Sequence, residues 1–294
     1  MRVDKRWIFR AVMFCLMGAS IAFAQESPSA ERSPVPAATR GQIACTGFIN
    51  GAPIPPDLYV AGGGDNEFMN KLHAYTVGDY VFLVNQGGPA ATVGEEFRLV
   101  RREKTTAWQD FSRPGLGPLP NFGTNNYFPG RNGDLDSLGT PYSDVGKVRI
   151  VKVTPEAAIA KIIFNCTAAN QGDIAIPYDP RPIPDYAPAS VDRFASSNGK
   201  LSGGITASRG DILTLGTGDI GYISLGQSDG VKPGDVFRVT RILYPMRVGA
   251  LMPPDLPPET VGQVVVLWTQ GKSSVVIVVS TTEGVNVGDA VQLE

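Results

Sequence analysis

The fold is decided by Asp229–Val239, a stretch that reads DGVKPGDVFRV. Its central KPGD suits a type II turn, because proline presets φ at the second position and glycine accepts a positive φ at the third. Residues 236–241 then alternate between apolar and polar side chains, which is typical of a half-buried strand. The stretch therefore predicts a turn, made of a glycine and an acid, that leads directly into a β-strand.

The same unit occurs 140 residues earlier in the chain. Residues 93–101, VGEEFRLVR, keep the glycine, an acid, the Phe-Arg pair and the closing arginine. Residues 78–101 align with residues 218–241 without a gap, and the later segments repeat at a separation of 116 residues. The two separations differ because the first copy carries a longer insertion, which we place at residues 102–144.

Six glycine-acid steps punctuate the two copies of this unit. A turn is needed at every copy, whereas a catalytic or metal site is needed only once, so we expect these acids to build turns. The six steps lie at residues 78–79, 94–95, 172–173, 218–219, 234–235 and 288–289.

Each copy reads as about five short strands separated by Gly-rich turns, with little helical periodicity. The chain contains 34 Gly and 24 Pro, which together with many Val, Ile, Thr and Tyr make a turn-rich β composition. A small antiparallel sheet of this kind avoids exposed edges by closing into a barrel. We therefore predict an all-β protein with two tandem small barrels, over residues 42–176 and 199–294. In the first barrel, residues 42–49 are expected to form the opening strand.

The segments outside the two barrels have distinct compositions. Residues 1–24 read as an export signal, with a positive start, an apolar run too short to span a membrane, and a small-residue cleavage site before Gln25. Residues 25–41 are predicted to be a disordered lead-in. Residues 177–198 begin with five prolines in twelve residues, so they form either an extended linker or an ordered strap across both barrels.

Two cysteines, Cys45 and Cys166, remain after removal of the signal. In an oxidising compartment such a pair often forms a disulfide, which here would fasten the two ends of the first repeat together. The alternative is two buried thiols. We predict a disulfide between Cys45 and Cys166, as expected for an exported protein.

Residues with catalytic or metal-binding chemistry are sparse. His73 is the only histidine and has no neighbouring base or nucleophile pattern, so neither a catalytic triad nor a zinc site is expected. Asp134 and Asp136 share a loop with Asn132, but the loop lacks the glycine and glutamate of a calcium loop, and Asx turns explain the same residues. The net charge of −2 and the lack of a basic patch argue against nucleic acid. We expect a non-catalytic protein without cofactor.

The insertion at residues 102–144 is rich in aromatic side chains. On a long loop these are either anchors for a glycan or a protein, or the packing that holds the loop in order. The possible binding surface consists of Trp108, Phe111, Phe122, Tyr127, Phe128 and Tyr142.

The repeat motif resembles the C-terminal domain of the flagellar assembly T protein family. The resemblance rests on SDGVKPGDxFxV at residues 228–239, VGxVxV at residues 261–266 and GDxV at residues 288–291. Similar modules occur in exported bacterial proteins that carry peptidoglycan-binding LysM repeats, although no LysM motif is present here. The resemblance implies SH3-like barrels and a non-catalytic role in the cell envelope.

These observations together predict a scaffold or protein-interaction module that is exported to the periplasm or outer envelope. The alternative is a peptidoglycan- or carbohydrate-binding module that uses the aromatic insertion. The expected partners are an envelope protein or peptidoglycan, and no membrane span is expected after signal cleavage.

Overall fold

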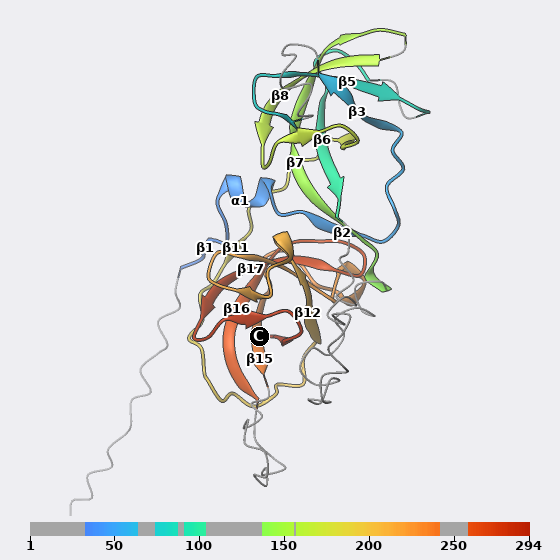
Figure 1. Ribbon diagram of the computed structural model, residues 1–294. Helices are drawn as coiled ribbons and strands as arrows, with labels where there is room; N and C mark the ends of the chain where they lie inside the picture. The colour runs from blue at the N-terminus through green and yellow to red at the C-terminus, as the bar shows by residue number, and fades with distance from the viewer. Residues whose placement is uncertain (1–32, 64–73, 88–90, 104–136, 156, 242–257) are drawn as a thin grey trace, which may run out of the picture. The chain divides into compact units, whose positions relative to one another are not determined.

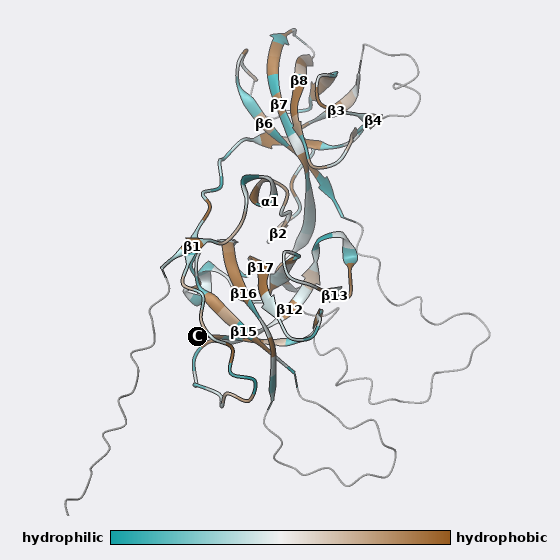
Figure 2. Cartoon of the chain, turned by 90° about the vertical axis from the view of Figure 1, so that its left-hand side faces the viewer, coloured by the Kyte–Doolittle hydropathy of each residue, from teal (hydrophilic) through white to brown (hydrophobic). Residues whose placement is uncertain are grey.

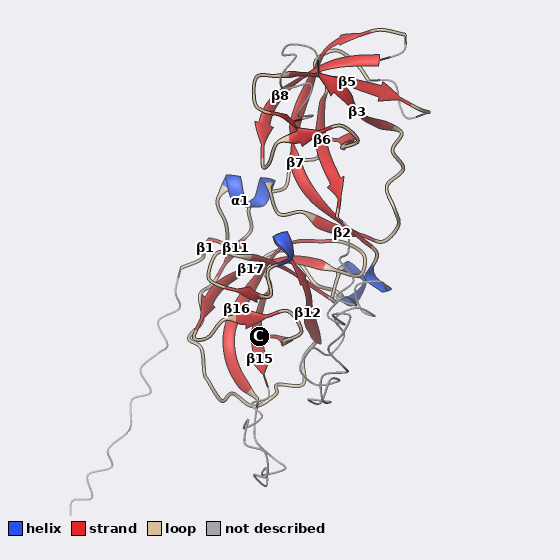
Figure 3. Ribbon diagram, viewed as in Figure 1, coloured by secondary structure: helices blue, strands red, loops and turns tan. Residues whose placement is uncertain are grey.

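The computed structural model describes residues 33–63, 74–87, 91–103, 137–155, 157–241 and 258–294, and these are almost entirely β-strands and turns (Figure 3). The predicted export signal lies outside the described residues. Of the predicted lead-in, residues 33–41 are described, and they are ordered: β1 (Val35–Pro36) pairs with β11 (Asp185–Tyr186). The prediction of disorder is therefore wrong for this last part of the lead-in.

The first barrel is a closed antiparallel sheet of six strands in the order β7-β6-β10-β3-β5-β8, with β8 returning to β7 (Figure 1). A short strand, β2 (Phe48–Asn50), extends this sheet along the start of β7, and β4 (Ala74–Tyr75) pairs with β9 (Ala169–Asn170) beside it. The barrel strands are β3 (Leu58–Gly63), β5 (Tyr80–Asn85), β6 (Glu96–Arg102), β7 (Thr140–Val153), β8 (Ala157–Asn165) and β10 (Ile174–Pro177).

The second barrel repeats this arrangement strand for strand, in the order β16-β15-β19-β12-β14-β17, with β17 returning to β16. Beside it β13 (Thr214–Leu215) pairs with β18 (Val285–Asn286), as β4 pairs with β9. Its strands are β12 (Ser202–Ser208), β14 (Ile220–Ile223), β15 (Val236–Arg241), β16 (Glu259–Thr269), β17 (Ser274–Thr281) and β19 (Ala290–Leu293), and two 3₁₀ turns lie at η2 (Arg209–Asp211) and η3 (Gln227–Asp229). The predicted class of two tandem small barrels is confirmed.

The duplication extends to the irregularities of the sheets. A β-bulge inserts an extra residue and increases the local twist, and in small barrels it turns a strand around the axis. Four bulges occur at matching positions of the two copies. They lie between Val60/Gly62 and Ile205/Ala207, between Leu99/Val100 and Val239/Thr240, between Lys147/Val148 and Gln263/Val264, and between Ile150/Lys152 and Val266/Trp268.

In the first copy one local prediction is wrong and one strand was not predicted. Of the predicted opening strand at residues 42–49, residues 42–44 belong to α1 (Arg40–Ala44) and only 48–49 to a strand, because Thr39 and Gln42 make a reciprocal capping box that starts a helix. The strand β3 was missed because its end, Ala61-Gly62-Gly63, reads as a loop. The glycine at 63 is required by packing, since a Cβ there would lie 2.3 Å from the ring of Tyr75.

All six glycine-acid steps form one kind of turn. In the turn at residues 232–235, the backbone N–H of Lys232 donates to the Asp235 carboxylate (2.8 Å) and the N–H of Asp235 donates to the carbonyl of Lys232 (3.1 Å). Gly234 donates to the carbonyl of Val266, and the N–H of Val266 donates to the carbonyl of Asp235, both at 2.9 Å. The other five turns have the same four bonds, and their acids are Asp79, Glu95, Asp173, Asp219 and Asp289. Each turn therefore docks on a neighbouring strand.

Three apolar clusters hold the molecule together. One fills each barrel, and a third combines residues of β2 and β7 with the outer faces of β14, β16 and β17. The strands β16 and β17 are consequently buried on both faces, which explains their continuous apolar sequence (Figure 2). The two barrels thus share a core.

The Pro-rich segment 177–198 is an ordered strap, the second of the two alternatives. Equivalent arginines of the two barrels hold it: Arg98 donates to the carbonyl of Asp179 (2.5 Å) and Arg238 donates to the carbonyl of Ser196 (2.6 Å). Between these points, Pro184 accepts a bond from the N–H of Ala37. The arginine of the repeated Phe-Arg pair therefore anchors the connection between the two copies.

Replacement of Gly234 by alanine tests the contact of this strap with the opening turn. Gly234 has φ of 92°, and a Cβ there would lie 2.8 Å from the carbonyl oxygen of Asp185, whereas at Gly94 (φ 90°) a Cβ meets nothing within 4 Å. We expect Gly94→Ala to lower the free energy of unfolding by about 1 kcal/mol through backbone strain alone. Gly234→Ala is expected to cost about 2 kcal/mol or more in urea unfolding. Equal losses in the two variants would show that the strap does not press on the turn.

Candidate functional site

The predicted aromatic surface is described at one position only, Tyr142, because the other five side chains lie at residues 104–136, outside the described residues. Tyr142 is 1% exposed within β7. Its ring stacks on Phe48 at 5.5 Å between centroids, and its hydroxyl accepts a bond from the N–H of Ile54. Tyr142 is therefore a packing residue and does not belong to a binding surface. The insertion between β6 and β7 is correspondingly shorter than predicted, at residues 103–139.

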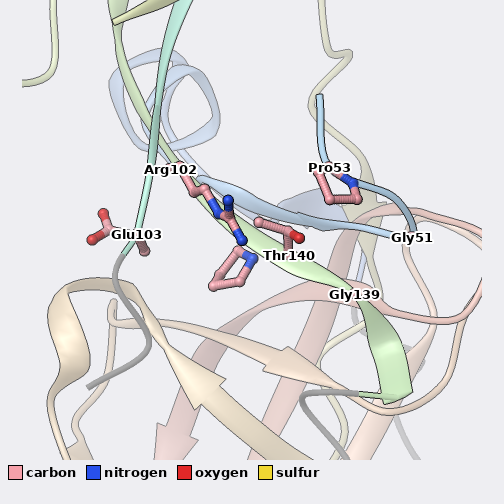
Figure 4. A pocket seen from close by; sticks show the side chains of 7 residues that line it. Gly51, Pro53, Arg102, Glu103, Gly139 and Thr140 are labelled. Carbon is pink, nitrogen blue, oxygen red and sulfur yellow. The ribbon is translucent and has the colours of Figure 1, made fainter. Parts of the chain in front are cut away.

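An open depression of about 280 Å³ lies where this insertion leaves β6 and rejoins β7 (Figure 4). The Arg102 guanidinium extends toward Thr140 in this view, and Glu103 lies apart from it. The depression is lined by Gly51, Pro53, Arg102, Glu103, Gly139, Thr140 and Pro141. One guanidinium and one hydroxyl can hold a polar ligand, but these residues include no nucleophile with a base beside it.

The base of the insertion is held tightly to β2. Gly139 has φ of 129°, and a Cβ at this position would lie 2.0 Å from the carbonyl oxygen of Asn50. The N–H of Glu103 donates to the carbonyl of Pro141 at 3.0 Å, which ties the two ends of the insertion together. The two ends of the insertion, next to residues 104 and 136, are therefore fixed to β2 and β7 and lie close together.

Thr46 is a fully buried polar residue that binds three distant parts of the described chain. Its hydroxyl accepts bonds from Arg181 (2.7 Å) and from the Trp268 indole N–H (3.0 Å), while its carbonyl accepts from the Tyr222 hydroxyl (2.7 Å). These partners come from the strap, from β16 and from β14. We call Thr46, Asp144, Arg181, Tyr222 and Trp268 the junction cluster.

Asp144 and Arg181 form the charged part of the junction cluster. The Arg181 side chain is 7% exposed and the Asp144 side chain 1%, and their closest N–O distance is 2.6 Å. Arg181 also stacks over Trp268, with 3.9 Å from its Cζ to the ring centroid, and Asp144 accepts a further bond from the N–H of Gly47. Burial lowers the pKa of Arg181 to about 10 against the opposing effect of Asp144, so the guanidinium remains charged at neutral pH. Burial likewise raises the pKa of the Tyr222 hydroxyl, which keeps it protonated as a donor.

Each barrel also contains its own copy of a second ion pair, between an arginine and an aspartate. Arg101 binds Asp173 with two bonds of 2.8 Å, and Arg241 binds Asp289 with bonds of 2.8 and 2.6 Å. Hydrogen bonding to these carboxylates raises the pKa of both arginines. Both acids also close glycine-acid turns, so their oxygens already have structural partners.

The remaining candidates for chemistry lie elsewhere. His73, Asn132, Asp134 and Asp136 are outside the described residues. Within the described ranges no group of three His, Cys, Asp or Glu side chains could hold a metal ion. Over the same ranges, no helix has the length and apolar character needed to cross a membrane.

The predicted disulfide between Cys45 and Cys166 is present, with 5.5 Å between the Cα atoms. It joins the C-terminal end of α1 to the residue after β8, and Cys45 directly precedes Thr46. The junction cluster itself was not predicted. The only cue for it was an arginine between prolines, at residues 180–182, which reads as a solvated linker.

Searches against protein-family models and against curated proteins find no match to this chain.

Proposed function

We propose that the protein is an exported, non-catalytic scaffold of the bacterial cell envelope that presents binding surfaces to other envelope proteins. The observation that carries this proposal is the Cys45–Cys166 disulfide, because structural disulfides persist in oxidising compartments. It agrees with the export signal read at residues 1–24. The resemblance of the repeat motif to the SH3-like domain of flagellar assembly T proteins supports the same location.

The buried polar side chains bind other groups of the protein, and this supports a scaffold function more than an enzymatic one. The buried charges of the junction cluster and of the Arg101–Asp173 and Arg241–Asp289 pairs are all bound to other protein groups. In the described ranges they hold turns, the strap and the two barrels in place. The shared apolar cluster packs the two barrels against each other, which suits a protein that positions partners.

A second candidate function is binding of peptidoglycan or another carbohydrate through the insertion. The open depression at its root favours this candidate, because Arg102 and Thr140 offer hydrogen-bond donors next to the aromatic segment. The five aromatic residues between 104 and 136 would supply the stacking surface.

Localisation of the tagged full chain tests the proposal. We expect the protein in the periplasmic or outer-envelope fraction, with Cys45 and Cys166 protected from alkylation until a reductant is added. A variant that lacks residues 2–24 should stay in the cytosol with both thiols reactive. If the full chain fractionates with cytosolic proteins and its thiols are free, the envelope proposal is wrong.

Sedimentation with purified sacculi separates the two candidates. The scaffold proposal expects the protein to remain in the supernatant. If the wild type sediments and the Trp108→Ala, Tyr127→Ala double variant does not, the carbohydrate-binding function replaces it.

A further inference from the structure

The duplication allows the same outer face to be compared on the two barrels. On the second barrel, the outward side chains of β14, β16 and β17 are buried under other parts of the chain: Tyr222 is 6% exposed and Leu267 is fully buried. On the first barrel, the matching side chains on β5 and β7 are open: Phe82 is 37% and Val151 is 41% exposed. One copy therefore uses this face for docking, and the other leaves it uncovered.

The correspondence is supported by strand register. Tyr80 pairs with Lys161 and Phe82 with Ile159, as Ile220 pairs with Ile277 and Tyr222 with Val275. Across the other strand pair, Arg149 lies opposite Lys161 and Lys152 opposite Ile159, as Val265 lies opposite Ile277 and Trp268 opposite Val275. The uncovered surface, which we call the β5–β8 face, is made of Phe82, Arg149, Val151, Lys152, Ile159 and Lys161.

The cover on the second barrel shows what kind of ligand this face accepts. Part of this cover is a short extended segment, in which Phe48 packs on Trp268 with 5.7 Å between ring centroids and Ile49 joins the same apolar cluster. Backbone carbonyls add polar contacts, since Thr46 accepts a bond from Tyr222 and Ile49 accepts one from Ser273. Large apolar anchors on an extended backbone are therefore the mode of recognition.

Charge distinguishes the two versions of the face. Three apolar positions of the second barrel, Val265, Trp268 and Ile277, are Arg149, Lys152 and Lys161 on the first. Glu96 neutralises Arg149 at 2.6 Å, whereas Lys152 and Lys161 take part in no ion pair among the described residues. The β5–β8 face thus combines exposed apolar groups with two cations that have no anionic partner there.

We propose that the β5–β8 face is a docking surface for an acidic segment of another protein, one that carries large apolar anchors and carboxylates placed against Lys152 and Lys161. A second copy of this chain fits poorly, because two-fold packing of the face on itself would bring these lysines toward each other. This inference rests on the proposed scaffold function, and it specifies the chemical class of the segment that the scaffold binds.

Selection from a short-peptide display library on the purified, oxidised full chain tests this proposal. We expect enriched peptides to combine aromatic or aliphatic residues with Asp or Glu. A synthetic peptide of the enriched sequence should bind Phe82→Ser, Lys161→Glu at least about tenfold more weakly than the wild type. Val93→Ser, which changes a 66% exposed valine outside the face, is the matched control and should bind as the wild type. The Lys152→Glu, Lys161→Glu variant isolates the charge effect.

Three results would overturn the proposal: no enrichment, enriched peptides without acidic residues, or equal binding to the face variants and the control. A dimer in sedimentation velocity that Lys161→Glu dissociates would replace it with self-association. Unchanged melting temperatures of the variants establish that the fold is intact, since every mutated side chain is exposed. The selection is independent of cellular location, so failure of the envelope proposal and failure of this docking surface are separate outcomes.

Discussion

Replacement of Asp144 by alanine is expected to lower the free energy of unfolding by about 3–5 kcal/mol, the loss that follows removal of one partner of a buried ion pair. The carboxylate accepts bonds from Arg181 and Gly47, and its side chain is 1% exposed. Without it, the Arg181 guanidinium is left buried without the carboxylate that binds it. Urea unfolding followed by Trp268 fluorescence measures the loss.

Glu96→Ala provides the matched comparison. Glu96 binds Arg149 and Lys147, but this pair lies near the surface, where an ion pair contributes about 1 kcal/mol or less. A second control replaces both charges of the buried pair, as Asp144→Leu with Arg181→Met. This double variant should be more stable than Asp144→Ala, because no unpaired charge remains. If Asp144→Ala loses no more stability than Glu96→Ala, the junction cluster does not hold the barrels together.

Loss of the Cys45–Cys166 disulfide is also expected to lower the free energy of unfolding by several kcal/mol. The bridge spans 121 residues, and for a loop of this length the chain-entropy account gives about 4–5 kcal/mol. We expect Cys45→Ser, Cys166→Ser to unfold at a correspondingly lower urea concentration than the oxidised wild type. Thr46 follows Cys45 directly, so release of the bridge should also loosen the junction cluster and change the near-UV signal of Trp268.

Reduction distinguishes the covalent effect from a packing defect. Dithiothreitol should bring the wild type to the stability of the double serine variant and leave that variant unchanged. A wild type that is equally stable before and after complete reduction would contradict the expected role of the bridge.

Local chemistry explains which parts of this fold were predictable. The glycine-acid turns were readable because each is complete within four residues, and their repetition revealed the duplication. The Cys45–Cys166 pair was predictable because only two cysteines follow the predicted export signal. Strand β3 was not, because its bulge and glycines follow from packing around Tyr75, which sequence does not display. Similarly, Thr39 and Gln42 override the strand-like pattern that follows them by capping a helix.

The candidate site was less accessible from sequence. Aromatic composition drew attention to the insertion, but Tyr142 belongs to the core because β7 begins earlier than the repeat alignment suggested. The sequence did not indicate that Arg181 is buried. Its burial depends on contact with Trp268 of the second barrel, which is distant in sequence. The β5–β8 face emerged only when strand register matched the two copies position by position.

The shared core has a consequence for the order in which this protein assembles. The outer face of the second barrel, with Tyr222, Trp268 and Val275, is covered by residues around Phe48 and Ile49 from the start of the described chain. Export that begins at the N-terminus delivers that cover first, and the Cys45–Cys166 bridge can close in the oxidising compartment before β12 to β19 arrive there. The last third of the chain, from β12 onward, then folds against a surface that is already in place, and at no stage of N-to-C delivery is the apolar outer face of the second barrel left exposed.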